Sequence, residues 1–410
     1  MLGSTFASLR YIDFRFLWLA SLSAGAASWA LIVARGWLVY DLSGSSVWVG
    51  VVTFSAMAPM FLAPPIAGFL ADKFDRKKLL AVLFAAQLLH NLVLALLAIA
   101  GVIEIWHIIA LSFINGCARA SQMPAAQALL PNLIPHDYLL NAISLNAATM
   151  QGSRLIGPAL IVPLMALFGL EAAFIGCTLF YVLSFFFTTR IKTVSVGEMS
   201  SQESPLSNFF AGVSFVYKHP LVLPLMVTIF LHCCLTMSFE SLLPVVGERF
   251  FHDGGLGAGY LMMAVGAGAL CLVLVTANIR DLRIRGRFLF LAAIGSGLAP
   301  ILLGTAANAS SALLGCVLMG ASEASYMAIA GAIIQMASPD AIRGRVMSVY
   351  LWHIGGMMAT FNLVNAALAD DFGVAPVLVI AGLVFTVSVV ISVGVRPLRR
   401  LYFEGEVTGK

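Results

Sequence analysis

Charged side chains are scarce in this sequence. Only 10% of the 410 residues are Asp, Glu, Lys or Arg, and 60% are hydrophobic, whereas soluble domains contain about 25% charged residues. A water-soluble core has no room for so large an apolar fraction, so a soluble globular protein is excluded. Most of the surface must instead face lipid.

Motifs of enzyme chemistry and metal binding are also missing. The six cysteines fall inside apolar stretches and lack the spacing of a zinc site. The glycine-rich stretch 254–268 carries no phosphate-loop lysine, and we find no nucleophile elbow or dinucleotide fingerprint. We therefore expect no enzymatic activity, no metal, no cofactor and no nucleic-acid partner.

Long apolar segments, by contrast, are abundant. A segment of about 20 apolar residues is long enough to cross a bilayer as a helix. We predict about twelve such spans, and therefore an all-α polytopic membrane protein. The spans cover roughly residues 14–40, 47–71, 79–101, 107–130, 140–168, 172–189, 221–246, 258–279, 288–306, 311–337, 346–369 and 374–395.

A polar gap divides the predicted spans into two sets of six. Within it, Ser204 and Pro205 form a typical helix start, and apolar residues follow at helical spacing. This pattern predicts an amphipathic helix on the inner membrane surface, or a plain connecting helix. The predicted domains are a first six-helix bundle (1–190), a linker (191–220), a second six-helix bundle (221–396) and a tail (397–410).

Lysine and arginine are unevenly distributed among the predicted loops. One alternating set of loops, which includes both ends of the chain, holds nearly all of them, whereas the other set holds only Arg249. Cations in short loops stay on the cytoplasmic side of a membrane. We therefore predict that both termini are cytoplasmic.

The two halves also resemble each other. When span 4 is laid over span 10, Gly116 falls on Gly320 and Ser121 on Ser325, and the register continues from span 5 to span 11. Parallel repeats of this kind build transporters whose substrate site lies at the repeat interface. We therefore expect two six-helix repeats.

A few ionised residues fall inside the predicted spans. Each costs about 2.5–3.5 kcal/mol at a helix centre on insertion scales, so it should face a partner or an aqueous cavity. We expect Arg35, which lies far along span 1, to reach the outer interface near Asp41. The five residues are Arg35, Arg119, Arg154, Glu240 and Glu323.

Polar residues share helical faces with these charges at intervals of three, four, seven or eight. Such stripes indicate cavity-lining faces, although hydrogen bonding between helices produces the same pattern. The stripes are Asn115, Arg119 and Gln122 on span 4; Glu323 and Tyr326 on span 10; and His232, Thr236 and Glu240 on span 7.

The loop between spans 2 and 3 contains the run 68–78, GFLADKFDRKK. It resembles the signature between helices 2 and 3 of the major facilitator superfamily, although Asp75 stands where a second glycine is common. Asp72 can pair with the local cations or face the N-terminus of span 11, whose dipole favours an anion, and the resemblance implies that it latches the cytoplasmic side shut. The matching residues are Gly68, Asp72, Arg76 and Lys77.

The resemblance extends through 37–45, 124–131, 141–146 and 154–159 to one branch of that superfamily, the bacterial exporters that include siderophore and macrolide efflux proteins. Gly157 and Pro158 are similar to the kernel of the helix-5 motif of drug/proton antiporters.

This resemblance implies the major facilitator fold in a bacterial inner membrane. It also implies alternating access and export of an amphipathic small molecule such as a drug, macrolide or siderophore, in exchange for protons carried by Glu323 and Glu240. A monomer is compatible with this interpretation. A lipid or lysolipid flippase, or a transport-dead receptor or scaffold, remains an alternative.

The repeat makes a further prediction. Because Arg119 and Glu323 occupy equivalent positions, we expect them at the same depth on opposite cavity walls, paired in one conformation. The alternative is that the helices are rotated so that each charge pairs within its own half. We expect Arg154 to assist if it faces inward.

Overall fold

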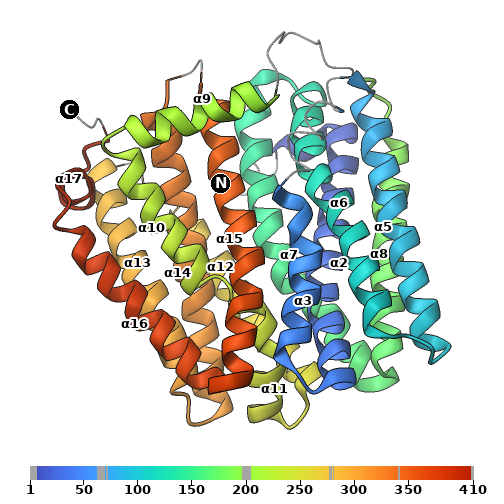
Figure 1. Cartoon of the computed structure of the whole chain (residues 1–410). Coiled ribbons are helices and arrows are strands. Elements are labelled where there is room, and N and C mark those ends of the chain that lie inside the picture. Colours follow the sequence, from blue (N-terminus) through green and yellow to red (C-terminus); the bar gives the residue numbers. More distant parts are fainter. Residues whose placement is uncertain are drawn as a thin grey trace.

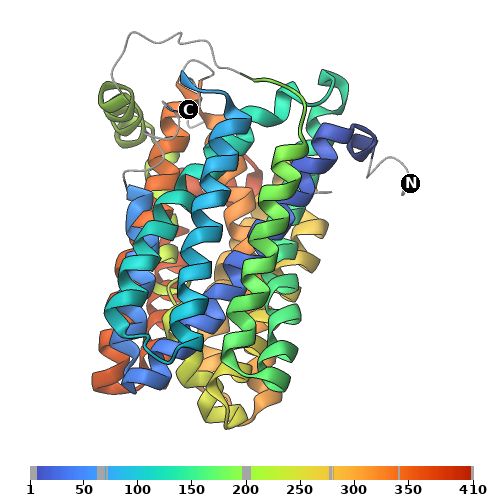
Figure 2. The ribbon, with the colours of Figure 1, turned by 90° about the vertical axis from the view of Figure 1, so that its right-hand side faces the viewer.

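The computed structural model shows a bundle of long helices that run roughly along one axis (Figure 1). It describes residues 7–61, 70, 73–195, 205–276, 279, 281–339 and 342–407. The first and last described elements lie at the same end of the bundle (Figure 2). We call this end the terminal face and the other end the opposite face.

The first half of the chain contributes six long helical segments, which we call the first helix group. Asp75 begins α5 by accepting a hydrogen bond from the backbone N–H of Lys77 (3.0 Å), and Gly44 ends α2 in the left-handed conformation (φ 64°). The elements are η1 (Ala7–Arg10), α2 (Ile12–Ser43), α3 (Ser46–Met57) with η2 (Ala58–Phe61), α5 (Arg76–Ile99), α6 (Ile105–Leu129), η3 (Leu130–Asn132), η4 (His136–Tyr138), α7 (Leu139–Phe168) and α8 (Leu170–Arg190).

The second half contributes the second helix group, α10 to α16, flanked by the surface helices α9 and α17. The elements are α9 (Pro205–Lys218), α10 (Val222–Leu235), η5 (Glu240–Leu242), α11 (Leu243–Phe251), α12 (Gly254–Thr276), α13 (Leu282–Gly304), α14 (Ala309–Ala337), α15 (Arg343–Phe372), α16 (Val374–Ser392) and α17 (Arg396–Glu404).

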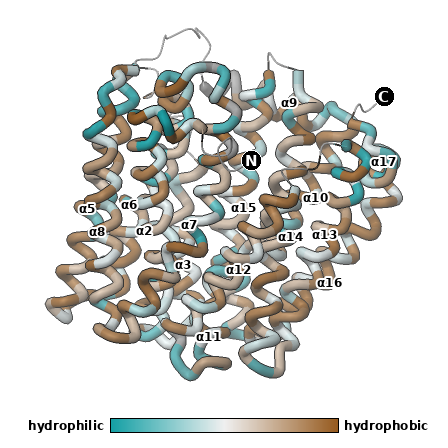
Figure 3. The backbone as a smooth tube through the Cα atoms, turned by 180° about the vertical axis from the view of Figure 1, so that it is seen from behind, coloured by the Kyte–Doolittle hydropathy of each residue, from teal (hydrophilic) through white to brown (hydrophobic). Residues whose placement is uncertain are grey.

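The prediction of an all-α polytopic protein is confirmed. In the described part of the chain, nine helical stretches are long and apolar enough to cross a membrane. Helices α6 and α15 are also long but more polar, and α3 continues through η2 beyond the described residues. Most residues along the helices are hydrophobic (Figure 3), and large apolar side chains such as Leu167 and Phe168 are 74% and 70% exposed.

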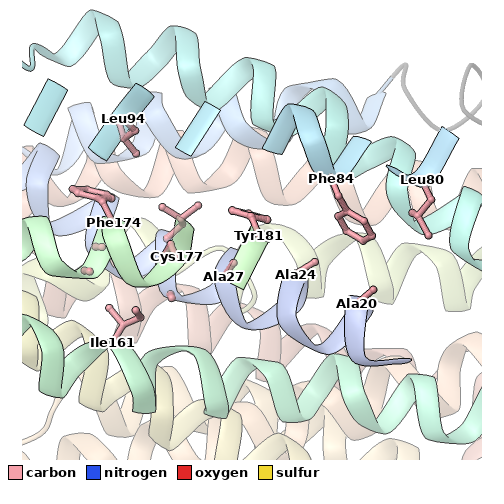
Figure 4. Packing of buried hydrophobic residues seen from close by; sticks show 14 of the residues in the cluster. Ala20, Ala24, Ala27, Leu80, Phe84, Leu94, Ile161, Phe174, Cys177 and Tyr181 are labelled. Carbon is pink, nitrogen blue, oxygen red and sulfur yellow. The ribbon is translucent and has the colours of Figure 1, made fainter. Parts of the chain in front are cut away.

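Small residues allow close packing within the first group. Ala20, Ala24 and Ala27 on α2 are fully or almost fully buried and belong to the same core as Phe174 and Tyr181 on α8 (Figure 4). Without a hydrophobic driving force in lipid, helices associate through such close van der Waals contact. The core therefore fixes α2, which carries part of the site described below.

The most extensive contacts between the two groups are those of α3 with α15 and of α7 with α12. Glycine is required at both contacts. A Cβ on Gly50 would lie 2.7 Å from the Cβ of Ala366, and one on Gly266 would lie 2.6 Å from the backbone nitrogen of Leu155. Gly50 lies near the start of α3, toward the opposite face, and Gly266 lies in the middle of α12.

Span 7 is broken, which contradicts the continuous helix predicted over 221–246. Helix α10 ends at Leu235, and the chain resumes as η5 at Glu240 and as α11. Pro244 explains the position of the break, because its ring would clash with the carbonyl of residue 240 in a continuous helix.

The freed backbone groups of the break are satisfied by α15. Asn365 Nδ2 donates to the carbonyl of Ser238 (2.8 Å), and the N–H of Ser241 donates to Asn362 Oδ1 (3.2 Å). Irregular backbone at membrane depth is tolerated only where protein supplies such partners. The break therefore depends on these two asparagines.

The predicted linker helix is present as α9, which lies across the terminal face (Figure 1). The ring of Phe209 packs at 6.0 Å from that of Trp352 on α15. A Cβ on Gly212 would lie 2.5 Å from the carbonyl oxygen of Arg345. The linker is thus seated on α15, while Ser204 lies outside the described residues.

Candidate functional site

A buried ion pair joins the two helix groups. Arg154 Nη1 on α7 lies 2.9 Å from Glu323 Oε1 on α14, and their side chains are only 4% and 9% exposed. A charge-assisted hydrogen bond of this length is strong, and removing either partner would leave an isolated charge in the membrane. The predicted pair of Arg119 with Glu323 is therefore absent from this conformation, and Arg154 pairs with Glu323 across the two groups instead.

Aromatic rings cover the arginines. The guanidinium of Arg154 lies 4.7 Å from the ring of Trp29 and 5.9 Å from that of Phe239, and the guanidinium of Arg119 lies 5.8 Å from Trp29. Cations are attracted to aromatic faces at these distances. Trp29 on α2 therefore positions two of the three arginines that lie within the predicted spans.

Next to the ion pair lies a small enclosed pocket. Arg35 from α2, Arg119 from α6 and Glu240 from η5 line it, together with apolar side chains such as Val52 and Met57 of α3. The first group thus supplies cations and the second group supplies the carboxylate. The pocket, like the ion pair, spans the boundary between the groups.

The position of Arg35 corrects the prediction made for it. Arg35 is 5% exposed and faces this pocket, whereas Asp41 lies at the exposed end of α2. The prediction was wrong because α3 and α11 pack against α2, with Val49 and Pro244 next to Gly36. These elements leave the side chain no path to the opposite face.

Two predicted cavity residues of span 7 lie elsewhere. His232 and Thr236 point into the second group, where Thr236 Oγ1 is 2.6 Å from His232 Nδ1 and Ser296 Oγ is 3.2 Å from both. Because the helix ends at Leu235, they share no face with Glu240. The predicted stripe of three residues therefore does not exist.

Tyr326 is also inside the second group. Its hydroxyl donates to Thr228 Oγ1 (2.7 Å), and its ring lies 4.7 Å from that of His232. The structure therefore places Tyr326 with His232 and Thr236, and it separates all three from the charged residues between the groups.

On span 4, the predicted stripe is divided in the same way. Arg119 faces the pocket, whereas Gln122 accepts a hydrogen bond from Gln87 Nε2 on α5 (3.0 Å) within the first group. Asn115 is 5% exposed, and its Oδ1 has no hydrogen-bond partner among the described residues.

Gly157 lies at a close contact between α7 and α2, and Pro158 follows it within α7. A Cβ on Gly157 would lie 2.3 Å from the carbonyl oxygen of Ala26, so only glycine permits this approach of α7 to α2. Ala26 lies three residues before Trp29, and Gly157 lies three residues after Arg154. The contact between α2 and α7 therefore sets the position of the arginine against the tryptophan ring.

The predicted elbow is described only in part, because Gly68 and Asp72 lie outside the described residues. Arg76 Nη1 donates to the carbonyl of Ala128 (3.0 Å) and to Ser195 Oγ (3.3 Å), which ties α5 to the end of α6 and to the segment after α8. Lys77 stands in the first turn of α5.

A second connection between the groups was missed by the sequence reasoning. At the opposite face, Asp370 near the end of α15 accepts hydrogen bonds at the start of α3, from the Ser46 N–H (2.8 Å), the Val47 N–H (3.3 Å) and Ser45 Oγ (2.5 Å). The paired serines at a helix start were a signal for capping, but nothing local indicated an acceptor so distant in the chain.

Among the described residues, no group of three or more His, Cys, Asp or Glu side chains is arranged to hold a metal ion.

Comparisons with known proteins agree with this architecture. The Staphyloferrin A transporter of Staphylococcus aureus is 24% identical over 360 residues, which cover 87% of this chain and 89% of the relative. The multidrug efflux pump Tap of Mycolicibacterium fortuitum is 23% identical over 399 residues, which cover 93% and 95%. Among solved structures, a POT family transporter in complex with a thioalcohol conjugated peptide superimposes with a TM-score of 0.76 at 12% identity, over 94% of this chain and 96% of that chain, which shows a shared fold.

The family model described as transmembrane secretion effector matches residues 3–401, which is nearly the whole chain. Because this match covers nearly the whole chain, and because the relatives are exporters of the major facilitator superfamily, the chain belongs to this family of that superfamily.

Proposed function

We propose that the protein is a secondary active transporter that exports amphipathic small organic molecules by alternating access, in exchange for protons. The observation that carries this proposal is the Arg154–Glu323 pair, which links the two helix groups in the interior of the bundle. The names of the relatives, which include a staphyloferrin transporter and a multidrug efflux pump, favour export of drugs, macrolides or siderophores.

The ion pair supplies a physical route to proton coupling. The groups can separate only if Arg154 and Glu323 part, and an unpaired buried charge costs about 3–5 kcal/mol. A proton on Glu323 removes its charge and weakens the attraction, so protonation and separation favour each other. Glu240, the other buried carboxylate between the groups, is the second candidate carrier.

The orientation of the transporter follows from its loop charges. We assign the terminal face to the cytoplasm of a bacterium, because nearly all loop lysines and arginines lie there. The opposite face is then external. The Asp370 contacts with α3 and the packing of Gly50 against Ala366 hold the two bundles, 1–190 and 221–396, together on that side. This conformation therefore corresponds to a state with the external side held shut.

Transport in inverted membrane vesicles tests the proposal. Ethidium, a cation, and fluorescein, an amphipathic anion, serve as probes, and an acid-inside pH gradient should drive accumulation of at least one of them by the wild type. Glu323→Gln should bind the probes but lose uphill accumulation, because the glutamine cannot release a proton. Glu248→Gln, a change at an exposed carboxylate of α11, is the matched control and should transport normally. Wild-type rate and pH dependence in Glu323→Gln would refute the coupling role of Glu323.

A further inference from the structure

The charges between the two groups do not balance. Glu323 is paired with Arg154, which leaves Arg35 and Arg119 in a pocket that contains one carboxylate, that of Glu240. Among the ionised residues that lie between the groups in the described part of the chain, cations therefore exceed anions by one. Like charges in a protein interior repel strongly, so this excess needs a compensating anion.

The hydrogen-bonding capacity of the pocket is also unfilled. Arg35 and Glu240 are 5% and 4% exposed, and neither Arg35 Nη1 nor Glu240 Oε2 has a hydrogen-bond partner among the described residues. A buried polar group without a partner is costly. The planar, fork-shaped guanidinium matches a carboxylate, which it can bind through two parallel hydrogen bonds.

The two arginines of the pocket belong to the first helix group, whereas its glutamate belongs to the second. Arg35 and Arg119 belong to α2 and α6 and stay together when the groups separate, whereas Glu240 moves away with the second group. Separation therefore removes the carboxylate from the pocket of the two arginines and leaves two cations facing the opening.

From this arrangement we propose that Arg35 and Arg119 form a binding site for a carboxylate group of the transported molecule, which takes the place of Glu240 when the bundles separate. The inference rests on the proposed function and adds the substrate class: amphipathic anions. Ile32, Val52 and Met57, which line the same pocket, offer apolar contacts for the part of the molecule next to the carboxylate. A cationic substrate is disfavoured at this position, because it would lie beside two arginines.

Binding of three small molecules with one skeleton tests the site. Phenylbutyrate, phenylbutyramide and phenylbutylamine carry a negative, neutral and positive head group, and each is added at millimolar concentration to the purified full-length protein. We expect phenylbutyrate alone to raise the thermal unfolding temperature. Equal stabilisation by the amide or amine, or none by the carboxylate, would overturn the proposal.

Two variants should shift phenylbutyrate affinity in opposite directions. Arg119→Gln should weaken it about tenfold, since a hydrogen bond to a charged group contributes roughly that much. Glu240→Gln removes the internal competitor and should strengthen it. Arg249→Gln, at the exposed arginine of α11, should leave it unchanged. An affinity in Glu240→Gln equal to or weaker than that of the wild type contradicts the exchange, and this variant is informative even if Arg119→Gln does not fold.

The binding and transport experiments distinguish an error in the proposed carboxylate site from an error in the proposed export function. If phenylbutyrate binds as expected but a pH gradient drives no transport in vesicles, the site stands and the proposed function fails. If ethidium is exported while phenylbutyrate does not bind, export stands and the carboxylate site fails.

Discussion

Removal of the Asp370 side chain should open the external side of the protein. Asp370 on α15 accepts three hydrogen bonds at the start of α3: from the Ser46 N–H, the Val47 N–H and the hydroxyl of Ser45. These bonds connect the two helix groups, so they exist only while the opposite face is held together. Asp370→Ala abolishes all of them without touching either bundle core.

The size of the effect follows from the type of contact. A side-chain acceptor at a helix N-terminus contributes about 0.5–2 kcal/mol, and its negative charge adds about 0.3–1 kcal/mol through the helix dipole. Asp370 is exposed, so solvent screening reduces the charge contribution. We therefore expect a total of about 1–2 kcal/mol, which changes the ratio of open to closed molecules by a factor of roughly 5–30.

Cysteine labelling measures this ratio. The endogenous cysteines are replaced, and a single cysteine is placed at Thr53, which lines the pocket between the groups. A membrane-impermeant maleimide added from outside should then react about 5–30 times faster in Asp370→Ala, and Asp370→Asn should give an intermediate rate because it keeps one acceptor oxygen. Asp371→Ala, a change at the exposed neighbouring carboxylate, is the control. Equal rates in Asp370→Ala and Asp371→Ala would refute the latch.

Other predictions concern the ion pair, the topology and the helix break. Arg154→Ala and Glu323→Ala should each lower stability by about 3–5 kcal/mol, and the double variant should lose less than the sum; strict additivity in thermal unfolding would show that the pair contributes no coupling. Cysteine at Ser310 should be labelled only from outside and cysteine at Glu404 only from the cytoplasm, and labelling of both from one side would contradict the topology. Asn362→Ala should cost about 1–3 kcal/mol by leaving a buried N–H of the break unpaired; unchanged unfolding in urea would show that the break is supported otherwise.

The sequence predicts a span well where the length of an apolar segment alone decides whether it forms a membrane-spanning helix. The predicted spans 172–189 and 374–395 correspond to α8 (Leu170–Arg190) and α16 (Val374–Ser392). In lipid, a long apolar segment has no alternative to a helix, because its backbone groups find no water. This local rule needs no knowledge of the neighbouring helices.

The break in span 7 was not predictable by that rule. Pro244 is visible in the sequence, but proline is common in membrane helices that bend without breaking. Here the chain breaks because Asn362 and Asn365, more than a hundred residues away, supply the hydrogen bonds that the break requires. The stripe predicted over His232 and Glu240 failed for the same reason, since helical periodicity does not extend across a break.

The partner of Glu323 was also beyond local reasoning. The internal repeat relates Arg119 to Glu323, and equivalent positions indicate similar depth, but not which side chains meet. Contact is decided by how closely helices approach, and here Gly266 allows α12 to reach the backbone of α7 beside Arg154. That approach brings Arg154 to α14, while Arg119 faces the pocket with Glu240.

A simpler signal for the site was present in the order of the charges. The ionised residues within the first six spans are all arginines, and those within the last six are both glutamates. If such charges paired within their own bundle, each half would need both signs. A half that contains only cations can neutralise them only at its boundary with the other half. The feature that predicts a charged core between the two bundles is therefore the separation of positive and negative residues between the repeats, rather than the equivalence of positions. Because the opposite charges belong to different bundles, their electrostatic attraction depends on whether the bundles are together or apart.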